Sequence, residues 1–494
     1  MKYITTRGGQ SASGAQAIVQ GLGKDGGLFV PDAFPQVRAE ELSAMAREPY
    51  RARAARILGR FLTDFSQEQL AGMVDSAHAR FDERGVAPLK ALSGGVRVIE
   101  LYHGPTLAFK DVALTLLPHL LTASARIAGE AREVLILAAT SGDTGKAALS
   151  GFADVPGTRC AVFYPQGGVS EVQRLQMVTQ RGGNTCVIAV RGNFDDAQTG
   201  VKRIFSDPAA AAAFAEKGLA LSSANSINWG RLAPQIVYYF SAYCDMAAAG
   251  DIAPGETINI CVPTGNFGNI LAAYYAKRMG LPVNKLICAS NRNNVLTDFI
   301  RTGRYDARRA FHLTTSPSMD ILISSNLERM LFELCGRDPE VVRGWMAELK
   351  EKGRYEIDAA SKTALTELMY GAWASEEDCA AEIARAWRGE NYLVDPHTAV
   401  AMKALRDYRA ETGDDRPCAV AATASPFKFG RAVSAALGLN TDADDFALCA
   451  RLSDMTGWAV PRAIAELPGL PVRHKAVCAP EDMLPALMKE MNRL

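Results

Sequence analysis

The chain is poor in the residues that hold metals or build disulfide frameworks. Its 494 residues include six histidines and ten cysteines, and no two cysteines form a C-x-x-C pair. The histidines form no cluster with metal-ligand spacing, so we expect no structural zinc site. Several cysteines lie in apolar runs, as Cys261 and Cys288 do. This is typical of reduced thiols in the core of a cytoplasmic protein.

The sequence also lacks net charge and long apolar runs. Its 54 basic and 54 acidic residues cancel, so no global field favours nucleic acid or an anionic membrane. No uncharged apolar stretch reaches the length that a bilayer requires, and the first residues lack the apolar core of a signal peptide. We therefore expect a cytoplasmic protein, a monomer or homodimer, whose partner is a small molecule. One or two local cations are enough to bind a small anion.

What the chain does have is an alternation of apolar runs with helical patterns. Hydrophobic residues make up 48% of it, and its length allows two or three cores. Most runs are continuously apolar, as in strands covered on both faces. The predicted strands are Val96–Leu101, Val134–Ala139, Cys160–Tyr164, Cys186–Val190, Ile258–Val262, Leu286–Ala289 and Cys418–Ala422. The first is broken by Arg97 and Glu100 and is expected at an edge. The alternation predicts an α/β protein with mainly parallel sheets.

Three units are expected along the chain. Residues 1–95 carry charged helical patterns and are predicted to form an N-terminal helical domain. Residues 96–225 would form a small α/β domain, and residues 226–494 a large one. Within the large domain, the charged and helix-rich stretch from about 291 to 390 is predicted to be a helical insertion rather than another sheet. The C-terminal tail is predicted to be helical.

Lys110 is the first candidate for chemistry. It follows Phe109 within the segment His103–Asp111 and precedes an apolar helical run. Burial in such a place would lower the pKa of the lysine and free its amine to attack a carbonyl, as Schiff-base formation requires. A lone lysine in this position more often extends its ammonium group past the helix into solvent. Lys110 therefore needs support from other residues.

Two glycine-rich loops, Thr140–Lys146 and Pro263–Asn269, follow predicted strands and precede predicted helices. In open parallel sheets, ligands bind beyond the carboxyl ends of strands, where helix N-termini present free N–H groups. Glycines let the backbone approach an anion closely. Each loop could equally be an ordinary tight turn with a good N-cap. A P-loop is excluded in the first loop, because Thr140 replaces the required glycine and Ala147 replaces the Mg²⁺-binding hydroxyl.

Two other segments are polar where the surrounding chain is not. Thr423–Gly430 follows the last predicted strand, and it is either a plain turn broken by Pro426 or a part of the site. Ser223–Gln235 contains three amides, two hydroxyls and Arg231, which is more than a helix cap requires. The guanidinium group of Arg231 offers a bidentate fork for phosphate or carboxylate.

In combination and in this order, four segments resemble the threonine synthase family: His103–Asp111, Thr140–Gly145, Asn225–Gln235 and Thr264–Asn269. That family belongs to the pyridoxal-phosphate enzymes with the tryptophan-synthase-β fold. Near the N-terminus, Tyr3, Thr6, Arg7 and the segment Asp25–Pro31 resemble the opening of its longer, bacterial and fungal branch. The resemblance implies two mainly parallel, helix-covered sheet domains with an added N-terminal domain.

The resemblance also implies roles for single residues. Lys110 would be the catalytic residue and would hold pyridoxal 5′-phosphate as a Schiff base. The other implied cofactor contacts are Gly265, Asn266, Phe267, Gly268 and Asn269 at the phosphate and Thr423 at the pyridine nitrogen. The implied substrate contacts are Thr140, Ser141, Asp143, Thr144 and Gly145 at the α-carboxylate and Asn225, Ser226 and Arg231 at the phosphate, with Lys146 a further candidate. Gly230 and Ser425 depart from the family pattern, and no role is assigned to Ser425.

The implied reaction converts O-phospho-L-homoserine and water to L-threonine and phosphate, the last step of threonine biosynthesis. One alternative is a related lyase that releases phosphate and a 2-oxo acid. A dehydrating or β-replacing relative acting on serine or threonine is disfavoured, because an unphosphorylated substrate does not need the cluster from Asn225 to Arg231. A non-catalytic ligand-binding homologue is disfavoured by the intact Lys110 and the two anion loops.

Overall fold

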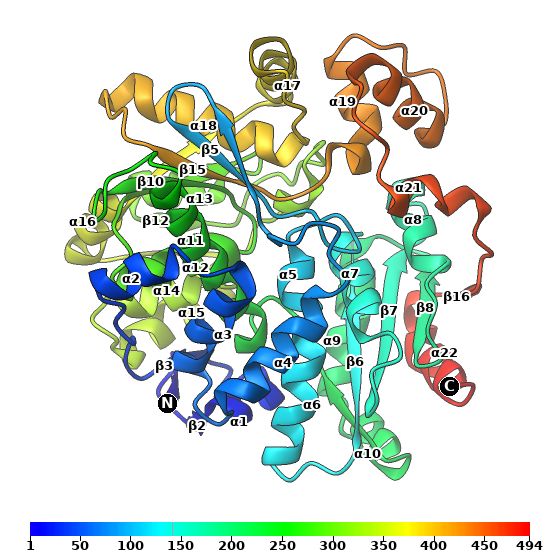
Figure 1. The fold of residues 1–494 in the computed structure, drawn as a ribbon. Coiled ribbons are helices and arrows are strands. Elements are labelled where there is room, and N and C mark those ends of the chain that lie inside the picture. Colours follow the sequence, from blue (N-terminus) through cyan, green and yellow to red (C-terminus); the bar gives the residue numbers. More distant parts are fainter. Residues whose placement is uncertain (141) are drawn as a thin grey trace.

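Two mainly parallel sheets, each with helices against it, carry most of the chain in this computed structural model, which describes residues 1–140 and 142–494 (Figure 1). The larger sheet has six strands. In spatial order they are β14 (Met369–Trp373), β11 (Val283–Ser290), β10 (Ile258–Pro263), β15 (Cys418–Ala422), β5 (Val96–Glu100) and β4 (Leu89–Leu92). Only the β4–β5 pair is antiparallel. Every residue of β10 and β15 is buried, as their nearly continuous apolar sequence predicts.

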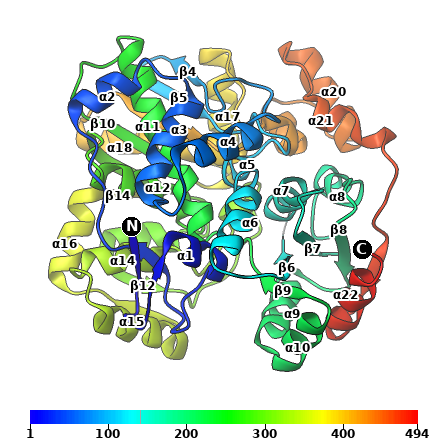
Figure 2. The same cartoon turned by 60° about the horizontal axis from the view of Figure 1, so that its bottom comes forward.

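The smaller sheet is parallel throughout and has five strands. In spatial order they are β16 (Ala476–Cys478), β8 (Thr185–Val190), β7 (Thr158–Pro165), β6 (Glu133–Ala139) and β9 (Leu219–Ser222). Its edge strand β16 comes from the C-terminal end of the chain. Figures 1 and 2 show this red segment lying against the cyan sheet, although almost 300 residues separate them in sequence.

Two small antiparallel elements complete the strands. β2 (Ser11–Ser13), β1 (Lys2–Thr5) and β3 (Phe29–Pro31) form a three-stranded sheet near the N-terminus. β12 (Arg304–Asp306) and β13 (Arg354–Glu356) form a two-stranded ribbon. Within the described residues, no helix is both long and apolar enough to cross a membrane.

Helices fill the intervals between the strands. In chain order they are α1 (Gly14–Gln20), α2 (Ala39–Met45), α3 (Tyr50–Phe61), α4 (Gln67–His78), α5 (Lys110–Leu114), α6 (Leu117–Ile127), α7 (Asp143–Phe152), α8 (Glu171–Val178), α9 (Phe194–Ser206), α10 (Pro208–Glu216), α11 (Trp229–Ala248), α12 (Gly268–Arg278), α13 (Val295–Thr302), α14 (Leu327–Leu334), α15 (Pro339–Lys352), α16 (Ala359–Leu368), α17 (Glu376–Glu390), α18 (Pro396–Thr412), α19 (Gly430–Ala436), α20 (Asp445–Thr456), α21 (Arg462–Ala465) and α22 (Met483–Met491). Four 3₁₀ turns accompany them: η1 (Pro317–Met319), η2 (Pro426–Phe429), η3 (Leu467–Gly469) and η4 (Pro480–Asp482).

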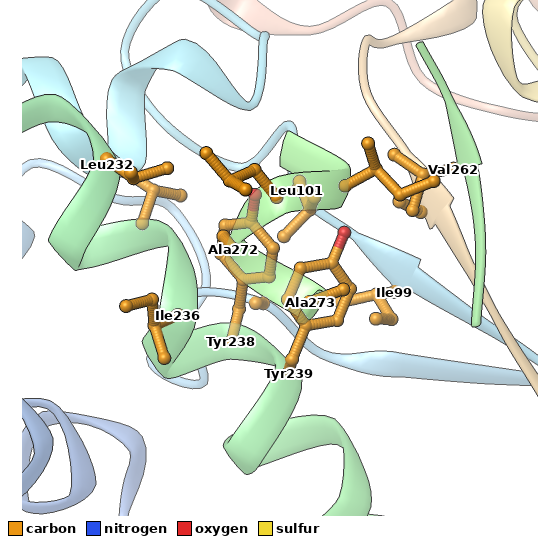
Figure 3. Packing of buried hydrophobic residues seen from close by; sticks show 14 of the residues in the cluster. Ile99, Leu101, Leu232, Ile236, Tyr238, Tyr239, Val262, Ala272 and Ala273 are labelled. Atoms are coloured by element: carbon orange, nitrogen blue, oxygen red, sulfur yellow. The ribbon is translucent and has the colours of Figure 1, made fainter. Parts of the chain in front are cut away.

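Helix α11 is buried along nearly its whole length and packs against α12. Figure 3 shows the contact, in which the small Ala272 and Ala273 of α12 lie near Tyr238 and Tyr239 of α11. Both tyrosine hydroxyls donate to Oδ1 of Asn269, at 2.6 and 2.5 Å. This packing fixes the first turn of α12, which directly follows one of the two glycine-rich loops.

The predicted fold class is confirmed, but several local expectations are wrong. The strand expected at 96–101 in the small domain is β5, which belongs to the large sheet and is not its edge, because β4 forms a hairpin outside it. The stretch 291–390 is not purely helical. It contributes β14 to the large sheet and also forms the β12–β13 ribbon. The N-terminal domain contains a sheet, and the C-terminal tail contains β16.

These errors have two causes. The strands β1, β2, β3, β12, β13 and β16 have three or four residues, which are too few to show an apolar run. β5 and β14 pair with strands far along the chain, so the local sequence does not show which sheet they join. Each of the other six predicted strands is confirmed, with boundaries shifted by a few residues at most.

Candidate active site

Lys110 is the first residue of α5, between the two sheets (Figure 1). The loop before it is joined to the loop after β15 by two backbone hydrogen bonds. The Phe109 N–H donates to the Thr423 carbonyl at 2.9 Å, and the Ser425 N–H donates to the Leu107 carbonyl at 3.1 Å. This gives Ser425 a structural contact of its own, and it fixes the distance between Lys110 and the segment that starts at Thr423.

Lys110 does not extend into solvent, since its side chain is only 10% exposed. Its Nζ lies 3.0 Å from the Ser318 hydroxyl and 3.5 Å from Oδ2 of Asp143. Burial lowers the pKa of Lys110 and the charges of Lys428 and Arg231 lower it further, while Asp143 opposes them. The amine is therefore closer to its nucleophilic neutral form at neutral pH than a surface lysine would be.

Asp143 is shared by two lysines. The buried Lys428 Nζ lies 2.7 Å from Oδ1 of Asp143 and also donates to the Thr106 carbonyl at 2.9 Å. Gln173 Nε2 donates to the same Oδ1 at 3.1 Å. Burial opposes ionisation of Asp143, but the two ammonium groups outweigh it and hold the pKa of this carboxyl far below its ordinary value. The carboxylate thus serves as counter-charge to the lysines.

The loop that joins β10 to α12 has hydrogen-bonded carbonyls, but most of its N–H groups have no acceptor among the described residues. The Gly265 carbonyl accepts from the Ser324 hydroxyl at 2.7 Å, and the Asn266 carbonyl accepts from the Asn326 N–H at 3.1 Å and its side-chain amide at 3.0 Å. Among the described residues, the N–H groups of Asn266, Phe267 and Gly268 find no acceptor. Phe267 adopts the left-handed conformation, with φ +63°, which turns successive N–H groups toward one side.

This loop fits a small dianion such as a phosphate group. The first N–H groups of α12 have no acceptor within the helix, and the helix dipole adds positive potential there. A Cβ at Gly265 would lie 2.5 Å from the Ser318 carbonyl, so only glycine fits. The buried amide nitrogen of Asn269 has no hydrogen-bond partner in the described chain. Because the two tyrosine hydroxyls fix the orientation of the amide through its Oδ1, this nitrogen can donate to a ligand.

Arg231, in the first turn of α11, is a buried cation without a carboxylate partner in the described chain. Its Nη1 donates to the Ala224 carbonyl at 2.5 Å, while its Nε has no partner there. Burial lowers the pKa of Arg231 to about 10, so it is still charged at neutral pH. The neighbouring Gly230 is explained by packing, because a Cβ there would lie 2.7 Å from Leu117 Cδ1.

The polar residues before α11 are connected to the phosphate-sized loop. The Asn326 side-chain amide that donates to the Asn266 carbonyl also approaches the Ser226 carbonyl at 3.3 Å. Asn225 is exposed, and its N–H donates to the Ser223 hydroxyl. Asn326 therefore connects the predicted cofactor loop at Asn266 with the predicted substrate segment at Ser226. The sequence analysis did not select Asn326.

The loop between β6 and α7 uses part of its hydrogen-bonding capacity internally. The Thr140 hydroxyl accepts from the N–H groups of Gly142 at 3.0 Å and Gly145 at 2.9 Å. Thr144 is half-buried, whereas Ser141 lies outside the described residues. Lys146 Nζ donates to Oε1 of Gln180 at 2.6 Å, so the structure gives this lysine a protein partner rather than a place beside Arg231.

Models of three protein families match the chain in succession. "Threonine synthase N terminus" matches residues 2–78, "Pyridoxal-phosphate dependent enzyme" matches 88–423, and "Threonine synthase, C-terminal" matches 398–477. Threonine synthase of Pseudomonas aeruginosa is 40% identical over 438 residues, which are 88% of this chain and 90% of that protein. The chain belongs to the threonine synthase family.

Other members of the threonine synthase family agree in fold. The crystal structure of pyridoxal-phosphate-bound threonine synthase from Brucella melitensis has a TM-score of 0.89 at 37% identity, covering 100% of this chain and 99% of that one. Human threonine synthase-like 1 is 41% identical over 436 residues, which are 86% of this chain. The chain spans only 58% of the length of that relative.

Four residues of the site were missed by the sequence analysis. Ser318, His397 and Lys428 contact Lys110 or one of its partners, and Asn326 contacts the loop between β10 and α12. Lys428 gave the clearest signal, because it is a charge between Phe427 and Phe429 in a loop already selected. Ser318 and Asn326 lie in the stretch read as a helical insertion. No local pattern in that stretch indicates that it folds back onto the threonine synthase site.

Proposed function

We propose that this protein converts O-phospho-L-homoserine and water to L-threonine and phosphate. The observation that carries the proposal is the buried guanidinium of Arg231, which has no carboxylate partner among the described residues and whose Nε has no hydrogen-bond partner there. Its charge also lowers the pKa of Lys110. Burying a cation without a counter-charge is costly, and an anionic substrate group at this position would offset that cost. With the α-carboxylate bound at the Thr140–Gly145 loop, a phosphorylated substrate supplies a second anionic group, whereas serine or threonine does not.

The cofactor is held by residues that fit it. Lys110 would supply the amine, the Gly265–Asn269 loop would take the phosphate, and Thr423 would bind the pyridine nitrogen. Pyridoxal phosphate, when bound, supplies an electron sink that makes the α and β protons of an amino acid acidic. Thr423 offers a neutral hydroxyl rather than a carboxylate, which makes that sink a mild one.

The remaining steps are assigned to side chains of this chain. Lys110 Nζ, in its free amine form, would remove and return the α and β protons of the substrate. Asp143 and Lys428 keep the local charge fixed while Lys110 changes its protonation state. The Arg231 guanidinium stabilises the charge that develops on the departing phosphate. The Thr140–Gly145 loop would orient the substrate carboxylate through the N–H groups of Asp143 and Thr144, for which the described residues provide no backbone acceptor. Closure of the two sheet domains would keep bulk water out during elimination.

A cytoplasmic setting is part of the proposal. It is supported by the ten cysteines, all of which are free thiols in the structure. Burial raises thiol pKa values. In Cys288, for example, burial raises the pKa to about 12. Such thiols resist oxidation because little thiolate is present.

The experiment that tests the function supplies the cofactor-loaded protein with O-phospho-L-homoserine and measures phosphate and threonine together. Equal amounts of the two products are expected. Phosphate accompanied by a 2-oxo acid would replace the synthase by a lyase. Neither product, from protein that binds the cofactor, would favour a ligand-binding homologue.

A further inference from the structure

A buried acid–histidine pair lies at the start of α18, beneath the site. Asp395 caps this helix by accepting from the N–H groups of His397 and Thr398, at 2.9 and 3.3 Å. The same carboxylate accepts from Nδ1 of His397 at 2.7 Å. Both side chains are almost completely buried, with exposures of 0 and 2%. The cap alone requires only Asp395, so the histidine ring needs a separate explanation.

The second ring nitrogen of His397 points into the site. Because Asp395 binds the Nδ1 proton, the neutral ring has its lone pair on Nε2. That lone pair accepts from the Ser318 N–H at 3.2 Å. The ring is also held edge-on against Phe429, with centroids 4.9 Å apart. The hydrogen-bonded chain therefore runs from Asp395 through His397 to the backbone of Ser318, in the 3₁₀ turn η1.

Ser318 joins the two parts of the site that bind the cofactor. Its hydroxyl lies 3.0 Å from Lys110 Nζ and 3.4 Å from Oδ2 of Asp143. Its carbonyl packs against Gly265, where a Cβ would approach to 2.5 Å. A shift of η1 would therefore do two things. It would move the Ser318 hydroxyl away from Lys110 Nζ, and it would press the Ser318 carbonyl against the loop at Gly265.

A serine hydroxyl suits a lysine that changes protonation state. The hydroxyl oxygen accepts a hydrogen bond from the ammonium form of Lys110, and the hydroxyl proton can be donated to the lone pair of the neutral amine. No proton is transferred to Ser318 in either state. The amine can thus lose and regain its proton without losing its orientation toward the substrate.

We propose that Ser318 is a further catalytic residue, which orients the Lys110 amine during proton transfer, and that Asp395 and His397 are positioning residues that hold Ser318 in place. The role in turnover rests on the proposed function, whereas the contact with the amine does not. For this reason the test measures both the amine itself and the reaction.

The first measurement is competitive labelling of Lys110 with acetic anhydride in the full-length, cofactor-free protein across a pH series, read by peptide mass spectrometry. The groups that act on this amine are Asp143 of α7, Lys428 of η2 and Arg231 of α11. Ser318→Ala removes an acceptor of the ammonium form, so the labelling midpoint is expected to fall by about one pH unit. His397→Phe is expected to shift it in the same direction by a smaller amount.

The second measurement is kcat and KM with O-phospho-L-homoserine. Ser318→Ala and His397→Phe are expected to lower kcat about 10- to 100-fold, as loss of a hydrogen bond to a charged group does, with little change in KM. His397→Gln keeps an acceptor near the Nε2 position and should recover part of the loss. If His397→Phe does not fold, Ser318→Ala and His397→Gln still carry both measurements.

The chain supplies a matched control in His78. It is equally buried and packs edge-on against Tyr50 and Phe81, but neither ring nitrogen has a partner in the described residues. His78→Phe should leave the labelling midpoint and kcat unchanged. The proposal is wrong if His397→Phe behaves like His78→Phe, or if Ser318→Ala keeps both values. If no threonine forms at all, the proposed function fails while the labelling midpoint still tests Ser318.

Discussion

The ammonium of Lys428 and the carboxylate of Asp143 are 2.7 Å apart, and both side chains are buried. Removing one partner of a buried pair costs about 3–5 kcal/mol when the other charge is left uncompensated. In Lys428→Met, Asp143 keeps Lys110 at 3.5 Å as a second counter-charge. The free energy of unfolding, measured by urea denaturation of the full-length protein, is therefore expected to fall by less than that amount, by about 1–3 kcal/mol.

The double variant Asp143→Asn/Lys428→Met should recover much of that loss, because it removes both charges together. Lys352→Met, which breaks a pair that is exposed to solvent, is the control and should change stability by less than about 1 kcal/mol. Additive losses in the double variant would contradict the coupling of the two groups.

Since two lysines converge on Asp143, the identity of the reactive amine is a prediction of its own. Lys110 is the expected attachment point, because Lys428 is tied to both Asp143 and the Thr106 carbonyl. Borohydride treatment of the cofactor-loaded protein should place the reduced label on the peptide that contains Lys110. The label should be absent from Lys110→Ala and present on Lys110 in Lys428→Met. Label on Lys428 in the unsubstituted protein or in Lys110→Ala would reverse the assignment.

The loops around the site could be predicted from the sequence, but the segments between them could not. Lys110, the Gly265–Asn269 loop and Arg231 all lie at strand ends or at the first turn of a helix. Short-range patterns of glycine, hydroxyl and apolar residues mark such places. The structure brings the three together.

Ser318 and His397 could not be found in this way. Ser318 is 208 residues away from Lys110 along the chain, and its contact depends on how η1 docks against Gly265. His397 follows Asp395 and Pro396, which read simply as a helix cap. Its proposed positioning role depends on Nε2, which faces the Ser318 N–H, and the sequence does not show this contact. A residue that acts through a tertiary contact, and whose local role is an ordinary one, cannot be recognised from a single sequence.

Arg231 is predicted to bind the phosphate of the substrate through its fork rather than through charge alone. Arg231→Lys keeps the charge but loses the paired N–H donors, so KM for O-phospho-L-homoserine should rise about 10- to 100-fold, equivalent to one or two charge-assisted hydrogen bonds. Cofactor absorbance should be retained, because Arg231 lies outside the cofactor loop.

Arg329 is the comparison for that prediction. It is also a buried arginine, but its donors are used by Asn326 and by the carbonyls of Phe29 and Ile227. Arg329→Lys is expected to reduce stability without a selective effect on KM. An unchanged KM in Arg231→Lys would remove this residue from the substrate site.

Lys146 gives a pH dependence whose sign can be worked out. Burial lowers its pKa to about 7 in the folded protein, whereas in an unfolded chain a lysine titrates near 10.4. Between these values the unfolded state binds the additional proton, so this group makes the free energy of unfolding rise with pH. Below about pH 7 both states are protonated, and the full cost of burying the charge remains.

Lys146→Met should therefore gain stability relative to the unsubstituted protein at pH 6, and the gain should shrink toward pH 10. Urea denaturation at four or more pH values measures the difference, in which the titrations of other groups largely cancel. Lys352→Met, at an exposed position, serves as the control for losing a lysine charge as such. Parallel stability curves for Lys146→Met and the unsubstituted protein would mean that Lys146 keeps its charge in the fold. The hydrogen bond from its ammonium to Gln180 would then outweigh its burial.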